Sequence, residues 1–151
     1  ESMTGKIVPD IVENQTLYTL SPAATCRDAA KMMEANKISA VLIVADALLV
    51  GIVTERDLTA KVLAASLDPD ATRLEAVMTP DPEVLAPDAT PPDALERMRI
   101  RGFRHLPIVD DDEIIGIVSI RDLYAATKKQ LEEDIRQRES FIFDTGYGAG
   151  A

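Results

Sequence analysis

Hydrophobic residues follow two patterns along this chain, one typical of buried strands and one typical of amphipathic helices. Four aliphatic runs predict strands in two pairs, each pair around a polar or acidic turn: 40–44 with 48–53, and 106–109 with 114–118. Before each pair, apolar residues recur at helical spacing, and these residues are Ala29, Met32 and Met33 in one segment and Leu95 and Met98 in the other. The pattern therefore predicts the same series of elements twice.

Polar residues mark the ends of these elements. Thr25 and Thr90 are expected N-caps, and each is followed three residues later by an aspartate, Asp28 or Asp93. A short extended segment precedes the first helix of each unit, at 16–20 and at 83–86. A second helix begins after each pair of strands, at Thr54 and at Ser119. The expected unit is strand–helix–strand–strand–helix.

The two units are copies of one another. The segment 51–58 (GIVTERDL) recurs 65 positions later as 116–123 (GIVSIRDL), and the same offset aligns Pro22 with Pro87. Duplication accounts for this agreement, and two copies of such length indicate a pseudo-twofold pair in place of a solenoid.

We therefore predict an α/β (α+β) fold of two tandem β-α-β-β-α repeats related by a pseudo-twofold axis. Each repeat is close to the lower size limit for independent folding, so the two are expected to share a sheet face. The expected parts are a disordered or tag-derived N-terminus (1–6), a first repeat (7–66), a linker (67–81), a second repeat (82–127), a C-terminal helix extension (128–143) and a flexible tail (144–151).

Composition narrows the classes of function. The net charge of −10 argues against a nucleic-acid or anionic-membrane partner. The single cysteine, Cys26, permits no intramolecular disulfide, and no apolar run has the length of a membrane span or the character of a signal peptide. We expect a cytoplasmic globular protein.

The repeated Thr54-x-x-Asp57 and Ser119-x-x-Asp122 motifs have two interpretations. As capping boxes, each hydroxyl accepts from a first-turn amide and each carboxylate accepts from the amide of the cap. As ligand contacts, each lies where a Gly-Ile-Val strand meets a helix N-terminus, whose amides and dipole suit a phosphate. The aspartate would then accept two hydrogen bonds from ribose hydroxyls, as the acidic residue of dinucleotide folds does.

These residues carry a resemblance to a known family. The duplicated Gly-hydrophobic-hydrophobic-Thr/Ser-x-x-Asp pattern, from about Ile7 to Tyr124, resembles the cystathionine β-synthase (CBS) domain pair, or Bateman module. Met78-Thr79-x-x-Pro82 and 103–109 (FRHLPIV) are similar to second-repeat signatures of that family. The resemblance implies a disc-shaped homodimer that binds AMP, ADP, ATP, NAD or S-adenosylmethionine in two clefts between the repeats.

The resemblance also implies which residues form the clefts. The first cleft would be formed by residues of both repeats: Ile52, Thr54, Asp57, Pro82, Glu83, Phe103, Arg104, His105 and Pro107. The second would be formed by Leu17, Tyr18, Ile38, Ser39, Ala40, Ile117, Ser119 and Asp122. Arg104 and His105 give the first cleft cationic or proton-donating side chains, whereas their counterparts in the second cleft, Ser39 and Ala40, carry no charge. We therefore expect the Asp57 cleft to prefer a phosphorylated ligand.

Other residues offer little chemistry of their own. His105 is the only histidine, so no metal site or catalytic constellation can be built from several histidines. We therefore predict no metal, no catalytic residue and no enzyme activity. Arg56 and Arg121 fit a solvated helix face as well as a phosphate contact. The acidic run 110–113 is expected to be a hairpin turn, and 128–136 a charged helix with a narrow apolar stripe that packs on a partner subunit.

Two classes of function fit these predictions. The first is a regulatory module that binds an adenosine ligand and acts on a separate, regulated protein. The alternative is a scaffolding or dimerisation protein whose clefts bind no ligand.

Overall fold

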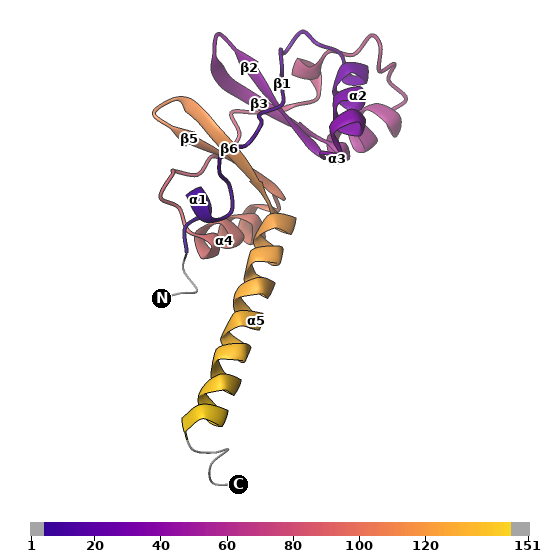
Figure 1. Ribbon diagram of the computed structural model, residues 1–151. Coiled ribbons are helices and arrows are strands. Elements are labelled where there is room, and N and C mark those ends of the chain that lie inside the picture. The colour runs from indigo at the N-terminus through magenta and orange to yellow at the C-terminus, as the bar shows by residue number, and fades with distance from the viewer. Residues whose placement is uncertain (1–4, 146–151) are drawn as a thin grey trace.

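The computed structural model in Figure 1 describes residues 5–145, with side chains through residue 141. Its elements in chain order are α1 (Ile7–Asp10), β1 (Thr19–Leu20), α2 (Cys26–Asn36), β2 (Ala40–Ala45), β3 (Leu48–Thr54), α3 (Glu55–Leu58), the π-helix η2 (Thr59–Leu63), the 3-10 helix η3 (Leu74–Ala76), β4 (Thr79–Pro80), α4 (Pro91–Arg101), β5 (His105–Asp110), β6 (Glu113–Ser119) and α5 (Ile120–Thr145). The predicted mixed fold with a long C-terminal helix is confirmed.

Each half of the molecule is built on an antiparallel hairpin, β2–β3 or β5–β6. A bulge interrupts the pairing after Ile43 in one hairpin and after Ile108 in the other, which are positions 65 residues apart. The turn residues Asp46-Ala47 and Asp111-Asp112 all have positive φ, the conformation of the tight turns that close hairpins. The acidic run 110–113 therefore forms the predicted turn.

The sheets of the two halves differ in their edge strands. In the first half β1 lies parallel to β2 and β4 antiparallel to β3, which gives the order β1-β2-β3-β4. The strand predicted at 83–86 is reduced to one parallel bridge between Leu85 and Ile108. Pro82 and Pro87 bound this segment, and proline donates no hydrogen bond to a ladder.

The N-terminal segment packs on the second half, although it precedes the first in sequence. Ile7 and Val12 are buried in one cluster with Leu106 and Leu123, and Figure 1 shows α1 beside α4. The Gln15 carboxamide oxygen accepts from the amide of Ile117 in β6, at 2.7 Å. The hydrophobic residues of this segment therefore contribute to the second core, although the first repeat is predicted to begin at residue 7.

The predicted linker packs on the first half in a matching way. Leu74 and Val77 are buried in the cluster that contains Cys26 and Met33, and β4 extends the sheet at β3. Val77 lies 65 residues after Val12, so the exchange of segments follows the duplication. The residues at 67–81 are part of the first core in addition to joining the repeats.

A third cluster lies between the two hairpins. Ala40, Leu42 and Ile52 are buried there, and Ile114 and Ile117 of β6 pack against them. The two halves therefore share an apolar contact between their sheets, as the sequence predicts.

The helix α5 extends away from both halves in Figure 1. Leu123 at its start is buried, whereas Leu131 and Ile135 farther along are exposed. These two residues form the predicted apolar stripe, and its packing on a partner subunit stays a prediction. The helix includes Asp144 and Thr145 of the predicted tail. The rest of that tail, 146–151, lies outside the described part of the chain, as do residues 1–4.

Candidate functional site

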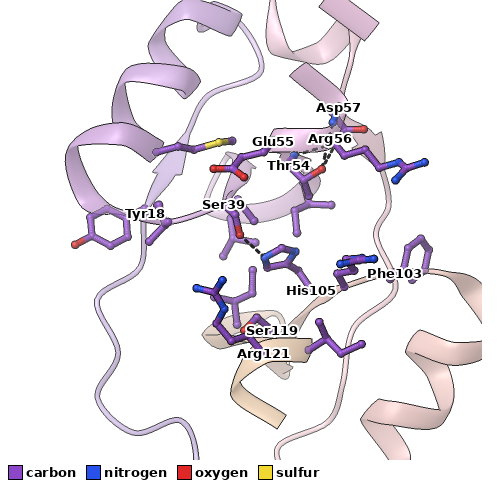
Figure 2. A pocket seen from close by; sticks show the side chains of 18 of the residues that line it. Tyr18, Ser39, Thr54, Glu55, Arg56, Asp57, Phe103, His105, Ser119 and Arg121 are labelled. Carbon is purple, nitrogen blue, oxygen red and sulfur yellow. Dashed lines mark hydrogen bonds between the residues drawn. The ribbon is translucent and has the colours of Figure 1, made fainter. Parts of the chain in front are cut away.

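A cavity of about 1390 Å³ lies between the two halves, and residues of both predicted clefts line it. From the first cleft come Ile52, Thr54, Asp57, Pro82, Glu83, Phe103, Arg104 and His105. From the second come Tyr18, Ile38, Ser39, Ala40, Ile117, Ser119 and Asp122. The structure thus brings both sets of residues to one continuous cavity, part of which is shown in Figure 2.

Two predicted site residues do not line this cavity. The side chain of Pro107 is fully buried in β5, whereas that of His105, at the start of the same strand, is partly exposed. Leu17 packs against the apolar cluster between the sheets. Both residues therefore support the walls of the cavity without facing it.

The Thr54–Asp57 motif forms a complete capping box. One Asp57 carboxylate oxygen, Oδ2, accepts from the Thr54 amide at 2.9 Å and from the Thr54 hydroxyl at 3.2 Å. The Thr54 hydroxyl oxygen in turn accepts from the Asp57 amide at 3.3 Å. The other carboxylate oxygen, Oδ1, lies 3.2 Å from the ammonium of Lys61. The capping interpretation of this motif is confirmed.

The Ser119–Asp122 motif forms the same box with fewer contacts. Asp122 Oδ2 accepts from the Ser119 amide at 3.1 Å, and the Ser119 hydroxyl accepts from the Asp122 amide at 3.1 Å. In the described part of the chain, Asp122 Oδ1 has no hydrogen-bond or ion-pair partner. Thr25 with Asp28 and Thr90 with Asp93 form two more capping boxes, which lie outside the cavity.

Backbone contacts fix the two helix starts at the cavity wall. The Glu55 amide donates to the Ser39 carbonyl at 3.0 Å, and 65 residues later the Ile120 amide donates to the Arg104 carbonyl at 2.9 Å. Because the caps and these bonds use most first-turn amides, fewer are free for a phosphate than the sequence led us to expect. Phosphate recognition at this site would depend mainly on side chains.

His105 joins the two halves in the middle of the cavity. Its Nε2 atom lies 2.9 Å from the Ser39 hydroxyl, and Figure 2 shows the two side chains pointing toward each other. Burial lowers the pKa of His105 below its usual 6.5; the charges of Asp122 and Glu55 oppose this shift, and the charge of Arg104 adds to it. His105 was assigned to the Asp57 cleft, yet its electrostatic partners include the carboxylate of the other cleft.

Several cationic side chains line the cavity. Arg56, Arg104 and Arg121 are exposed and line its wall. Lys37 also lines it and forms an exposed ion pair with Glu34 at 3.2 Å. The duplication places Arg56 and Arg121 in equivalent positions, and their presence in the cavity favours a ligand contact over a purely solvated helix face.

Glu83 is a carboxylate of the cavity wall that lies between two arginines. Its oxygens lie 3.2 Å from Arg97 and 3.6 Å from Arg101, both on α4, and Arg101 stacks 5.7 Å from the centre of the Phe103 ring. Glu83 Oε1 is buried without a hydrogen bond. These contacts attach the Pro82–Glu83 segment to α4 and shape one wall.

Several residues of the cavity were not predicted. They come from segments next to the predicted ones and include Gln15, Thr16, Met33, Leu42, Glu55, Thr79, Gly102 and Ile120. Thr16, Glu55, Gly102 and Ile120 are adjacent in sequence to predicted site residues, so proximity was the available signal for these four. Lys61 does not line the cavity, but its spacing of four residues from Asp57 was a signal for an ion pair on a helix.

Two searches of the described residues gave no site of another kind. No three or more His, Cys, Asp or Glu side chains among them are grouped to hold a metal ion. Within the same residues, the helices lack the length and apolar character that crossing a membrane requires.

Comparisons with known proteins agree with this geometry. The CBS domain model matches residues 8–64 and 74–129. The CBS domain-containing protein CBSCBSPB2 of Arabidopsis thaliana is 37% identical over 113 residues, which are 74% of this chain and 21% of that protein. The chain thus spans about a fifth of the length of the Arabidopsis relative.

Solved structures give the same result. A CBS-domain protein from Burkholderia ambifaria MC40-6 has a TM-score of 0.75 and 33% identity, covering 79% of this chain and 91% of its own. The structure of CBSX2 in complex with AMP has a TM-score of 0.65 and 26% identity, covering 77% and 90%. With two matched repeats and the geometry above, this chain belongs to the CBS domain family.

Proposed function

We propose that this protein is a regulatory module that binds an adenosine ligand in the cavity between its repeats. CBS domain pairs are regulatory modules, and a structural relative is in complex with AMP. The ligand classes that fit are AMP, ADP, ATP, NAD and S-adenosylmethionine. The protein would act through its shape or stability on a separate regulated protein, without catalysis, and would do so as a homodimer in the cytoplasm.

One observation carries this proposal: a single large cavity contains both copies of the Thr/Ser-x-x-Asp motif. Its volume of about 1390 Å³ is above the range of about 300–1,000 Å³ that is typical of small-molecule sites. Aliphatic residues such as Ile38, Ile52 and Ile117 offer apolar surface for a purine. Carboxylates suit a ribose diol, and the arginines on the wall suit phosphate.

The chemistry of the lining also argues for binding over catalysis. The single histidine has a lowered pKa and a hydrogen bond to a serine hydroxyl, and the two aspartates cap helices. Ser39 and His105 are within hydrogen-bond distance, but among the described residues no carboxylate is hydrogen-bonded to the imidazole to orient it as the base of a catalytic triad. We therefore propose that a bound nucleotide is released unchanged.

Titration calorimetry and thermal unfolding test this proposal. Each of the five ligands is added to the protein, with CMP as a control that carries ribose and phosphate without a purine. An adenosine ligand at about 100 times its Kd should stabilise the fold by about 2.7 kcal/mol, and CMP should have a much smaller effect. If none of the five ligands gives heat or a shift in melting temperature, the scaffolding alternative replaces the sensor.

A further inference from the structure

The two copies of the motif differ in how many hydrogen bonds their carboxylates can still accept. Resting on the proposed function, we infer that Asp122 holds the ribose of the ligand, whereas Asp57 is a structural residue whose remaining oxygen is bound by Lys61. This inference reverses the preference expected from Arg104 and His105, and it assigns the nucleoside subsite to one half of the cavity.

The carboxylate of Asp57 is nearly saturated. An ionised carboxylate offers about four acceptor sites, two on each oxygen. Oδ2 of Asp57 receives the amide and the hydroxyl of Thr54, and Oδ1 receives the ammonium of Lys61. A ribose diol donates two hydrogen bonds, and Asp57 has about one site left for them. Its side chain is also only 14% exposed.

The carboxylate of Asp122 has the capacity that Asp57 lacks. It receives one hydrogen bond, from the Ser119 amide to Oδ2, and about three acceptor sites remain. Asp122 is exposed and lines the cavity. Among the residues that the structure describes, none is placed to bind its Oδ1 oxygen before a ligand arrives.

Two contacts make the difference, the Thr54 hydroxyl on Oδ2 and Lys61 on Oδ1, and Lys61 is the one that occupies the second oxygen of Asp57. Lys61 follows Asp57 by four residues, one helical turn, and it also donates to the Val77 carbonyl at 3.0 Å, which fixes its direction. The duplication places Ala126 at the equivalent position, four residues after Asp122. An alanine has no group for the carboxylate, so the second copy of the motif keeps its aspartate free.

Other polar groups surround the Asp122 half. His105 pairs directly with Ser119 in the β5–β6 ladder, and its ring is held by Ser39. Figure 2 shows Ser119 and Arg121 close to His105 on the same side of the cavity. A nucleotide whose ribose is bound by Asp122 would therefore have Arg121 and His105 near its phosphate.

The first experiment compares aspartate variants by calorimetric titration with AMP. Asp122→Ala should lower the affinity by about ten- to a hundredfold, the loss expected for hydrogen bonds to a charged acceptor. Asp57→Ala should lower it by no more than about threefold. Asp93→Ala is the matched control, because it removes a capping box of the same type outside the cavity. Asp122→Asn separates charge from capping, since asparagine also caps helices.

The second experiment exchanges the residues that follow the aspartates. Ala126→Lys should pair the new ammonium with Asp122 and weaken AMP binding by about twofold or more. Lys61→Ala should free Asp57 Oδ1 and add a second, weaker binding event to the single event of the parent protein. Circular dichroism and melting temperature confirm that each variant folds.

The outcomes separate this inference from the proposed function. If Asp57→Ala abolishes binding and Asp122→Ala preserves it, or if the parent protein has two equal sites, the assignment of the ribose to Asp122 is wrong. The proposed sensor function is unaffected by either result. Binding of no adenosine ligand by the parent protein overturns both. The inference is supported if AMP affinity is lost only in Asp122→Ala and Asp122→Asn, and if Ala126→Lys and Lys61→Ala have the effects given above.

Discussion

The hydroxyl of Ser39 and the Nε2 atom of His105 lie 2.9 Å apart, and this hydrogen bond joins the two repeats at the centre of the cavity. Ser39 precedes β2 in the first half, and His105 begins β5 in the second. A neutral imidazole has one donor and one acceptor nitrogen, whereas an imidazolium has two donors. The contact therefore links the protonation state of one residue to the packing of both halves.

The stability of the protein should fall when His105 becomes protonated. Burial holds its pKa below 6.5 in the folded state, so the unfolded chain binds the proton first as the pH falls. The contribution of His105 is therefore fully present above about pH 6.5, the unfolded pKa, and is lost as the pH falls through this value toward the lower folded pKa. Asp122 and Glu55 reduce the effect, and Arg104 increases it.

Urea unfolding at about pH 7.5 and about pH 5.5 measures this dependence. The free energy of unfolding should decrease more in the parent protein than in His105→Gln, which keeps a polar side chain and does not titrate. Carboxylates that do not interact with residue 105 contribute equally in both proteins, so their effects cancel in the comparison. Equal decreases in the two proteins would show that another group is responsible.

Gly116→Ala should destabilise the contact between the N-terminal segment and β6. An added Cβ would lie 2.6 Å from Val12 Cγ1 and 3.0 Å from Gln15 Oε1. Val12 is buried and β-branched, so it cannot move aside without a cost. Overpacking of this kind costs about 1–3 kcal/mol, and hydrogen exchange at residues 7–15 should increase.

Gly102→Ala provides the matched control for that change. A Cβ at Gly102 meets no atom within 4 Å, but φ is 79°, so the substitution costs about 1 kcal/mol through backbone strain alone. Hydrogen exchange at residues 7–15 should stay as in the parent protein. An increase there in both variants would mean that general destabilisation, and not the contact at Gly116, loosens the segment.

The hairpins and helices could be predicted because their signals are local. Continuous aliphatic runs predict the strands, the acidic turn residues accept positive φ, and the threonine–aspartate pairs mark the helix starts. The duplication then extended each local prediction to its partner, and the structure adds a shared feature that was not predicted, the bulges after Ile43 and Ile108.

The exchange of segments could not be predicted in the same way. The pattern around Ile7 and Val12 indicates that these side chains are buried, but hydrophobic burial is non-directional and does not identify the core they enter. Similarly, Asp57 and Asp122 occupy equivalent motifs, and the spacing of Lys61 from Asp57 permits an ion pair but does not show how many acceptor sites of the carboxylate stay free. The site was therefore predictable as a set of residues, but the number of free acceptor sites on each aspartate was not.

Ile7→Ala should destabilise the second half, in spite of lying at the start of the first. Ile7 is 1% exposed, and its amide donates to the Ala89 carbonyl at 3.3 Å. Loss of a buried isoleucine side chain costs about 2–5 kcal/mol, because it combines lost transfer energy with a cavity. Local opening should then increase hydrogen exchange in β5 and β6 more than in β2 and β3.

Ile100→Ala removes the same atoms from an exposed position on α4 and is the control for this prediction. Its effect on the free energy of unfolding should stay within about 0.5 kcal/mol, as is usual for surface substitutions. If Ile7→Ala is as mild as this control, the N-terminal segment contributes little to the second core. If its main effect is on exchange in β2 and β3, the segment stabilises the first half and not the second.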